Sequence, residues 1–258
     1  MIDAAIATLA GYLPVFVLAS MRVALTFAAL PAPFGAIAPV QIRTAFSIMT
    51  TAALILPQVH DLPMVKLDLA VLTQAAIGEI FLGGVIGMTV RVTLAAAEMA
   101  GSMAGQAMGL GFASSVDPTQ GESVLPTTYL FDSLATLIFL SFNGHHVLLA
   151  ALAASFRVAP VGQTPAVAHS FGLINLGGDL VARGLQIAAP VIATMFIVQL
   201  GTAFVSRTAP RVHLFAFAFS VTIAAGMVVL WLAAPAVCTA IAVQVRHVPD
   251  ALSSLGVF

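Results

Sequence analysis

The stretch Gly105-Gln-Ala-Met-Gly-Leu-Gly-Phe-Ala-Ser-Ser-Val-Asp-Pro118 separates two long apolar segments of this chain. It is rich in glycine and ends in serine, aspartate and proline, which favour turns and loops over helix. Main chain outside a helix leaves amide groups that hydrocarbon cannot satisfy, so at membrane depth it persists only where protein buries it or where it lines a watery cavity. The pattern predicts an unwound segment, over about residues 106–122, that belongs to a pore, a gate or a binding cavity.

The composition of the whole chain is that of a membrane protein. Of 258 residues, 60% are hydrophobic and only 7% are charged, and the mean hydropathy is +1.09. A soluble domain carries roughly 25% charged residues, so no soluble surface could be built from so few. The net charge is −1 and no run of lysine and arginine occurs, which excludes a nucleic-acid partner.

Windows of about 20 apolar residues, the length that spans a bilayer, divide the chain into about six hydrophobic segments. The sequence therefore predicts an all-α, polytopic membrane protein that forms one domain over residues 1–258. The segments cover about residues 4–30, 40–57, 69–110, 124–155, 180–206 and 212–243. The longest polar connection is expected over residues 156–179, which contain Gly177-Gly178.

Glycines recur at a spacing of four in the third segment, as Gly83-x-x-x-Gly87, Gly101-x-x-x-Gly105 and Gly105-x-x-x-Gly109. This spacing places small residues one turn apart on a helix face, where another backbone can approach closely. One interpretation is packing between helices of one chain, and the other is an interface with other subunits. We take Gly83, Gly87, Gly101 and Gly105 as candidate residues for subunit packing.

Three acidic residues lie inside hydrophobic segments, where a charged group costs at least about 2.5–3.5 kcal/mol and needs a partner or water. They are Glu79, Glu98 and Asp132. They could form a proton or ion relay, or they could be paired structurally with Arg22, Arg91 or Arg183, or with a neighbouring subunit. Because no two acids are three or four residues apart, as a helical relay requires, we expect buried structural roles.

The remaining polar features do not indicate a catalytic or metal site. His145 and His146 are adjacent, so on a helix they point about 100° apart and make a poor metal pair. A helix break at Asn143-Gly144 is the better interpretation. No nucleophile elbow, phosphate-binding loop or zinc motif occurs in the sequence, and we expect no enzyme, no metal and no cofactor.

Methionines precede the glycine-rich segment. Met99, Met103 and Met108 are spaced by four and then five residues, and methionine is flexible enough to fill irregular gaps. They could fill the protein core, or they could form a deformable seal around a pore. Met103 and Met108 are the candidate seal residues.

Five short motifs follow one another along the chain. They are Pro31-Ala-Pro-Phe-Gly35 with Pro39 and Arg43, Glu79-Ile-Phe-Leu-Gly83 with Gly87, Gly105-Gln-Ala-Met-Gly-Leu-Gly-Phe-Ala113 with Val116-Asp-Pro118, Phe142-Asn-Gly-His145, and Arg207-Thr-Ala-Pro210. In this order, and with this length and hydropathy, they resemble the FliR/SctT family of flagellar and injectisome export apparatuses. The chain departs from the family pattern at Phe217-Ala-Phe-Ser220, where members often carry Gly-Phe-Pro, and this bears on the branch rather than on the family.

The resemblance implies a subunit that is neither an enzyme nor a solute carrier. Such a subunit joins FliP- and FliQ-like membrane subunits in the gate through which unfolded flagellar proteins leave the cytoplasm, with FlhB-like and FlhA-like export components as further partners. It implies kinked helical hairpins in contact with these neighbours and with membrane lipid. The implied location is the bacterial inner membrane, in the export apparatus of the flagellar basal body.

The resemblance also implies that the glycine-rich segment plugs the closed channel. The plug residues would be Gly109, Leu110, Gly111, Phe112, Ala113, Ser114, Ser115, Val116, Asp117 and Pro118. The flagellar branch is preferred, with an injectisome subunit of the SctT type as the alternative. An ion-coupled secondary transporter is a more distant alternative, which the absence of two related halves in the sequence disfavours.

Overall fold

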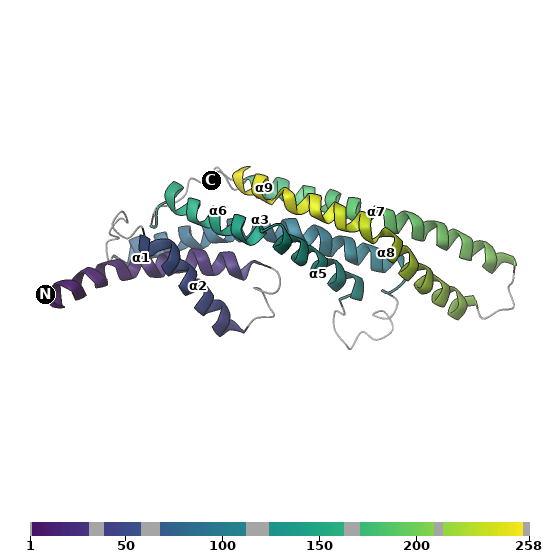
Figure 1. Cartoon of the computed structure of the whole chain (residues 1–258), viewed down its shortest axis with the longest axis horizontal. Coiled ribbons are helices and arrows are strands. Elements are labelled where there is room, and N and C mark those ends of the chain that lie inside the picture. The colour runs from purple at the N-terminus through teal and green to yellow at the C-terminus, as the bar shows by residue number, and fades with distance from the viewer. Residues whose placement is uncertain are drawn as a thin grey trace. The chain divides into compact units, whose positions relative to one another are not determined.

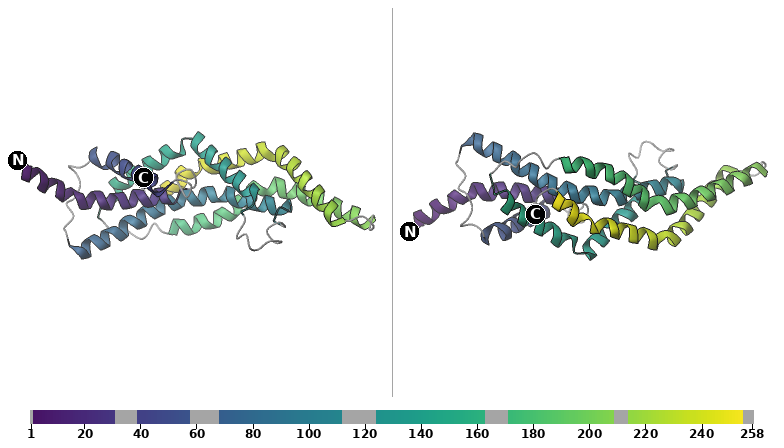
Figure 2. Two further views of the ribbon diagram at one scale, coloured as in Figure 1. Left: turned by 90° about the horizontal axis from the view of Figure 1, so that it is seen from below. Right: turned by 90° about the horizontal axis from the view of Figure 1, so that it is seen from above.

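Every described segment with regular structure is a helix in the computed structural model of the chain (Figure 1, Figure 2). The structure describes residues 2–30, 39–57, 68–111, 124–162, 171–208 and 214–254. The helices are α1 (Ile2–Ala28), α2 (Val40–Ile55), α3 (Leu69–Ala107), α5 (Pro126–Ser141), α6 (Gly144–Val158), α7 (Phe171–Thr208), α8 (Leu214–Arg246) and α9 (Val248–Ser254). The all-α prediction is confirmed.

Several of these helices have the length and composition of membrane spans. Leu69–Ala107, Leu180–Val205 and Phe219–Ser253 are each long and apolar enough to cross a bilayer, and α5 together with α6 makes a fourth, broken candidate. Tyr12–Ala28 and Val40–Ile55 are apolar but shorter. The described part of the chain therefore confirms a polytopic membrane protein.

The broken candidate span has the break that the sequence predicted. Asn143 adopts a left-handed conformation, with φ 55° and ψ 32°, between α5 and α6. Asparagine tolerates this conformation better than most residues with a side chain. The main-chain NH of His146 donates to the carbonyl oxygen of Asn143 at 2.9 Å, so the new helix starts directly after the break.

One predicted boundary is wrong. The connection expected over residues 156–179 is shorter, because α6 continues to Val158 and α7 begins at Phe171. Gly177-Gly178 therefore lies inside α7 and not in a loop. Glycine is tolerated inside helices of membrane proteins more readily than in soluble ones, and the glycine pair alone was a poor signal for a turn.

The chain divides into two compact units, each assembled from separated stretches of sequence. The first comprises Met1–Val92, Asn143–Leu176 and His247–Phe258, and the second comprises Thr93–Phe142 and Gly177–Arg246. Within the first unit α1 packs on α2 and α6 packs on α9, and within the second α5 packs on α8 (Figure 1). The single domain over residues 1–258 stays a prediction.

In the first unit, two glycines of α3 form the surface on which α1 packs. A Cβ atom added at Gly83 would meet the carbonyl oxygen of Arg22, and one added at Gly87 would lie 2.7 Å from the carbonyl oxygen of Thr26. Across the same contact, the Thr26 hydroxyl donates to the carbonyl oxygen of Gly83 at 3.1 Å. The small residues thus let two backbones approach closely enough for a side chain of one helix to bond the main chain of the other.

In the second unit, the next two glycines of α3 pack in the same way on the start of α5. A Cβ atom at Gly101 would lie 2.6 Å from the carbonyl oxygen of Thr127, and one at Gly105 would meet the Thr127 hydroxyl oxygen. All four glycines proposed for subunit packing therefore lie against helices of their own chain. Contacts between these glycines and other subunits stay a prediction.

This packing predicts different responses to alanine at two glycines of the second unit. Gly101→Ala is expected to destabilise the chain by about 1–3 kcal/mol, because the added methyl group must displace main chain. Gly201 of α7 has no atom within 4 Å of an added Cβ, so Gly201→Ala should be neutral or stabilising by up to about 1 kcal/mol. Thermal unfolding of the detergent-purified chain measures both, and equal losses in the two variants would contradict the close packing.

Candidate functional site

α3 ends in a glycine cap at the point where the predicted plug begins. The main-chain NH of Gly109 donates to the carbonyl oxygen of Gln106, and that of Leu110 donates to the carbonyl oxygen of Gly105, both at 3.0 Å. Gly109 has a φ of 80°. This pair of hydrogen bonds around a left-handed glycine is the Schellman motif, which satisfies the last carbonyl groups of a helix. Glycine adopts the conformation without a steric cost.

Three of the ten predicted plug residues are described. Gly109, Leu110 and Gly111 are each half-buried in the second unit. The other seven lie outside the described residues: Phe112, Ala113, Ser114, Ser115, Val116, Asp117 and Pro118. The plug assignment therefore stays a prediction. The structure shows how the chain leaves α3 at the start of this segment.

Two other helices of the second unit hold the end of α3 in place. From α7, the side-chain amide of Gln199 donates to the carbonyl oxygen of Ala107 at 2.8 Å. From α8, Gly226 leaves room for Met108, whose Cγ would lie 2.7 Å from a Cβ added at that glycine. Sequence reasoning missed both residues. A lone amide in an apolar helix was the available signal for Gln199.

The two candidate seal residues differ in their surroundings. Met108 is fully buried inside the chain, where it fills the space above Gly226, so the core-filling interpretation describes it better. Met103 is half-buried on α3, and its role in a seal stays a prediction.

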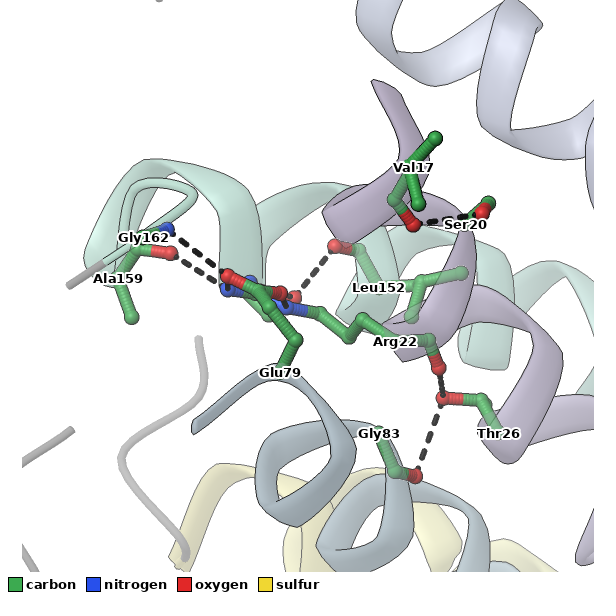
Figure 3. A network of polar contacts seen from close by, with 10 residues as sticks. Val17, Ser20, Arg22, Thr26, Glu79, Gly83, Leu152, Ala159 and Gly162 are labelled. Carbon is green, nitrogen blue, oxygen red and sulfur yellow. Dashed lines mark hydrogen bonds and ion pairs between the residues drawn. The ribbon is translucent and has the colours of Figure 1, made fainter. Parts of the chain in front are cut away.

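In the first unit, Arg22 of α1 and Glu79 of α3 form a buried, two-point ion pair (Figure 3). The guanidinium Nε donates to Oε2 of Glu79 at 2.6 Å and Nη2 donates to Oε1 at 3.0 Å. Both side chains are 0% exposed. Two parallel charge-assisted hydrogen bonds of this kind are among the strongest polar contacts in proteins.

The groups around this pair supply further hydrogen bonds to both side chains. Arg22 donates from Nη1 to the Ser155 hydroxyl at 3.1 Å and from Nη2 to the carbonyl oxygen of Ala159 at 3.0 Å. Oε1 of Glu79 also accepts from the main-chain NH of Gly162 at 3.1 Å. Figure 3 shows Ala159 and Gly162 facing the pair from the turn that follows α6.

An aromatic ring completes the surroundings of the guanidinium. Its central carbon lies 4.4 Å from the centroid of the Phe156 ring, a distance at which a cation interacts favourably with the ring face. α1, α3 and α6 thus all contribute to one polar cluster. Ser155, Ala159 and Gly162 were not predicted from the sequence, because main-chain partners and a lone serine carry no distinctive signal.

The other acidic candidates and the histidine pair lie elsewhere. Glu98 and Asp132 are half-buried in the second unit. His145 is half-buried near the start of α6, its Nδ1 has no hydrogen-bond partner among the described residues, and its ring centroid lies 4.4 Å from that of His146. Among the described residues, no group of three or more His, Cys, Asp or Glu side chains is arranged to hold a metal ion.

Fold and site together define a class of protein: a polytopic, all-α membrane protein with a buried, hydrogen-bonded ion pair and a capped helix that leads into a glycine-rich segment. A family model described as bacterial export proteins, family 1, matches residues 13–248. The chain belongs to this family, which confirms the resemblance drawn from its motifs. Its members are export-apparatus subunits.

Named relatives include flagellar biosynthetic proteins and a Yop translocation protein. The chain is similar to the flagellar biosynthetic protein FliR of Pectobacterium carotovorum subsp. carotovorum, with 33% identity over 160 residues, covering 62% of this chain and 61% of the relative. It is similar to FliR of Bacillus subtilis (strain 168), with 28% identity over 228 residues, covering 84% and 85%. The Yop proteins translocation protein T of Yersinia pestis is 28% identical over 177 residues, covering 67% and 68%.

The extent of these matches varies. For the relatives from Pectobacterium carotovorum and Escherichia coli (strain K12), the chain spans only 61% and 59% of their length.

The ion pair predicts a large loss of stability when one charge is removed alone. Glu79→Leu leaves the Arg22 guanidinium buried without its counter-charge, which costs about 3–5 kcal/mol. Removing both charges, as in Arg22→Met with Glu79→Leu, should recover a large part of that loss. The matched control is Asp250→Asn, which removes an exposed carboxylate 3.5 Å from His247 Nδ1 and should have little effect. Unfolding of the purified variants tests this, and additive single losses would contradict the coupling.

The glycine cap predicts a preference for residues that tolerate a left-handed conformation. Gly109→Ala should cost about 1–2 kcal/mol, and Gly109→Asn should cost less, because asparagine visits this region more readily. Gly111, which is outside the left-handed region, provides the control through Gly111→Ala. Unfolding measurements on the three variants distinguish these outcomes. Equal effects at positions 109 and 111 would show that the cap conformation is not what matters.

Proposed function

We propose that this chain is a membrane subunit of a type III protein export apparatus. In this proposal it forms, with FliP- and FliQ-like subunits, the gate for unfolded flagellar proteins in the bacterial inner membrane. Membership of the export family over residues 13–248 carries the proposal. The names of the FliR relatives support the flagellar branch. FlhB-like and FlhA-like components would be further partners.

Exposed apolar side chains support a role inside a larger membrane assembly. Phe196 and Ile197 of α7 are 61% and 68% exposed, and Trp231 of α8 is 76% exposed. Large apolar side chains in such numbers need lipid or other subunits to cover them. Lipid and other subunits are both expected to surround an export-gate subunit.

The end of α3 supports the plug as part of the proposal. The Schellman cap stops the helix at a defined residue, and Gln199 and Gly226 hold that end in the second unit. A segment that starts from an anchored point can block a channel without an ordered ladder of its own, and such a segment is cheap to displace. The glycine-rich residues 109–118 would then close the resting channel.

The hydrogen bonds of the buried ion pair disfavour the alternative function of an ion-coupled secondary transporter. Both carboxylate oxygens of Glu79 are occupied by Arg22 and Gly162. A carboxylate that couples ion transport must exchange its ligand in each cycle, whereas this one accepts three hydrogen bonds from its own chain. A structural role for Glu79 is the simpler account.

An injectisome subunit is the second candidate, because the similarity to the Yersinia pestis translocation protein covers about two thirds of each chain. Complementation separates the two branches. The chain should restore motility to cells that lack their own flagellar FliR, and it should not restore secretion in cells that lack the injectisome subunit. The reverse result would assign the chain to the injectisome branch.

Co-purification tests membership of the gate. The tagged full-length chain, expressed in its own cells, is expected to bring down two smaller hydrophobic membrane proteins of the FliP and FliQ type. An untagged culture serves as the control for unspecific recovery. Recovery of the chain alone under mild detergent conditions would overturn the proposal.

Deletion of residues 110–119 tests the plug. Cells that express the deleted variant should leak ions and small solutes, because the channel would lack its block. Gly177→Ala, at a glycine with open space around it, is the control that should keep the membrane tight. The deleted variant must still co-purify with its partners. An assembled complex in a tight membrane would remove the plug from the proposal.

A further inference from the structure

A small groove lies between α1 and α2 in the first unit. Its volume is about 180 Å³. Ala24, Phe27 and Ala28 of α1 form one wall, and Val40 and Arg43 stand on the side of α2. Phe27 also makes an edge-to-face contact with Phe46, with ring centroids 5.0 Å apart, which holds the two helices together beside the groove.

Arg43 contributes a positive charge to the lining of this groove. Its Nε is buried and has no hydrogen-bond partner in the part of the chain that the structure describes. Arg22 of the same unit differs in its hydrogen bonding, because its guanidinium binds Glu79, Ser155 and a carbonyl oxygen. A buried donor without a partner costs free energy, so Arg43 is suited to a ligand from outside the chain.

The neighbouring hydroxyl groups direct their protons to the main chain of α2 and not into the groove. Thr44 and Ser47 also line the groove, but the Thr44 hydroxyl donates to the carbonyl oxygen of Gln41 at 3.0 Å and that of Ser47 donates to the carbonyl oxygen of Arg43 at 2.8 Å. Their protons are therefore used within α2. The guanidinium remains as the donor that can face a ligand in the groove.

The position of Arg43 on its helix adds to the attraction for an anion. Arg43 lies in the first turn of α2, whose N-cap residue Pro39 provides no side-chain cap. The free NH groups and the dipole of a helix favour negative charge at this end. The groove thus combines a formal positive charge with the positive end of a helix.

We propose that this groove binds the phosphate of an anionic phospholipid. Arg43 donates hydrogen bonds to the phosphate oxygens, which its planar guanidinium fits in a two-point manner. The start of an acyl chain lies against Ala24, Phe27, Ala28 and Val40. The apolar wall selects a lipid over free phosphate, which would gain nothing from it. Arginine near a helix end commonly reaches the headgroup layer in this way.

This inference depends on the membrane class of the protein and not on its role in export. The test uses the detergent-purified full-length chain. Lipid binding is followed by native mass spectrometry and by the rise in melting temperature as phosphatidylglycerol is added, with phosphatidylcholine and inorganic phosphate as separate arms. The wild-type chain should bind phosphatidylglycerol at least about tenfold more tightly than Arg43→Gln does, as the loss of a charge-assisted contact implies.

Two further variants separate a lipid site from a folding defect. Ala28→Leu fills the groove and keeps the charge, and it should weaken phosphatidylglycerol binding while the chain remains folded. Arg157→Gln removes another arginine of the first unit, one that is exposed on α6, and should leave binding unchanged. Together these variants test whether binding depends both on the positive charge of Arg43 and on the open space beside it.

Three results would overturn the inference. Undiminished phosphatidylglycerol binding by Arg43→Gln would remove Arg43 from the site. Equal stabilisation by inorganic phosphate would identify a free anion as the ligand rather than a lipid. An equal loss of stability by Arg43→Gln with and without added lipid would place the partner of Arg43 within the protein itself.

Discussion

The bidentate contact between Arg22 and Glu79 joins α1 to α3 in the first unit, and groups of α6 and the turn after it bind the same pair. Charges buried in apolar surroundings are stable only when paired and fully hydrogen-bonded. The pair reaches that state because α1 and α3 approach closely at Gly83, one turn beyond Glu79. The turn after α6 then brings Ala159 and Gly162 to the same atoms. Three helices are joined by a cluster in which Arg22 and Glu79 each make several hydrogen bonds.

At the end of α3, polar groups receive their hydrogen bonds from neutral partners. A helix that stops inside an apolar environment exposes carbonyl oxygens, and each needs a donor. Gly109 turns the chain so that two main-chain NH groups reach back to the last turn, and Gln199 supplies a third donor from α7. The segment beyond Gly111 therefore starts from a fixed point. This is why an unwound segment at this place is physically consistent with a membrane protein.

Arg43 illustrates what happens when the chain does not provide such a partner. The Arg22 guanidinium is enclosed by acceptors and an aromatic ring, whereas the Arg43 Nε is buried beside a groove without an acceptor among the described residues. The difference separates a charge that stabilises the fold from one that is available to a ligand. Composition alone does not distinguish these two arginines.

The sequence by itself determined the membrane class, the places of the hydrophobic helices, the break at Asn143 and the end of α3 near Gly109. Each follows from local chemistry: apolar length, or a residue that tolerates a left-handed backbone. The tertiary structure decided which partners the polar groups find. Ser155, Gly162 and Gln199 lie far along the chain from the groups they bind, so no local pattern marks them. It also turned the α3 glycines toward helices of their own chain, because the close approach of two backbones needs residues without a side chain, and it continued α7 through Gly177-Gly178.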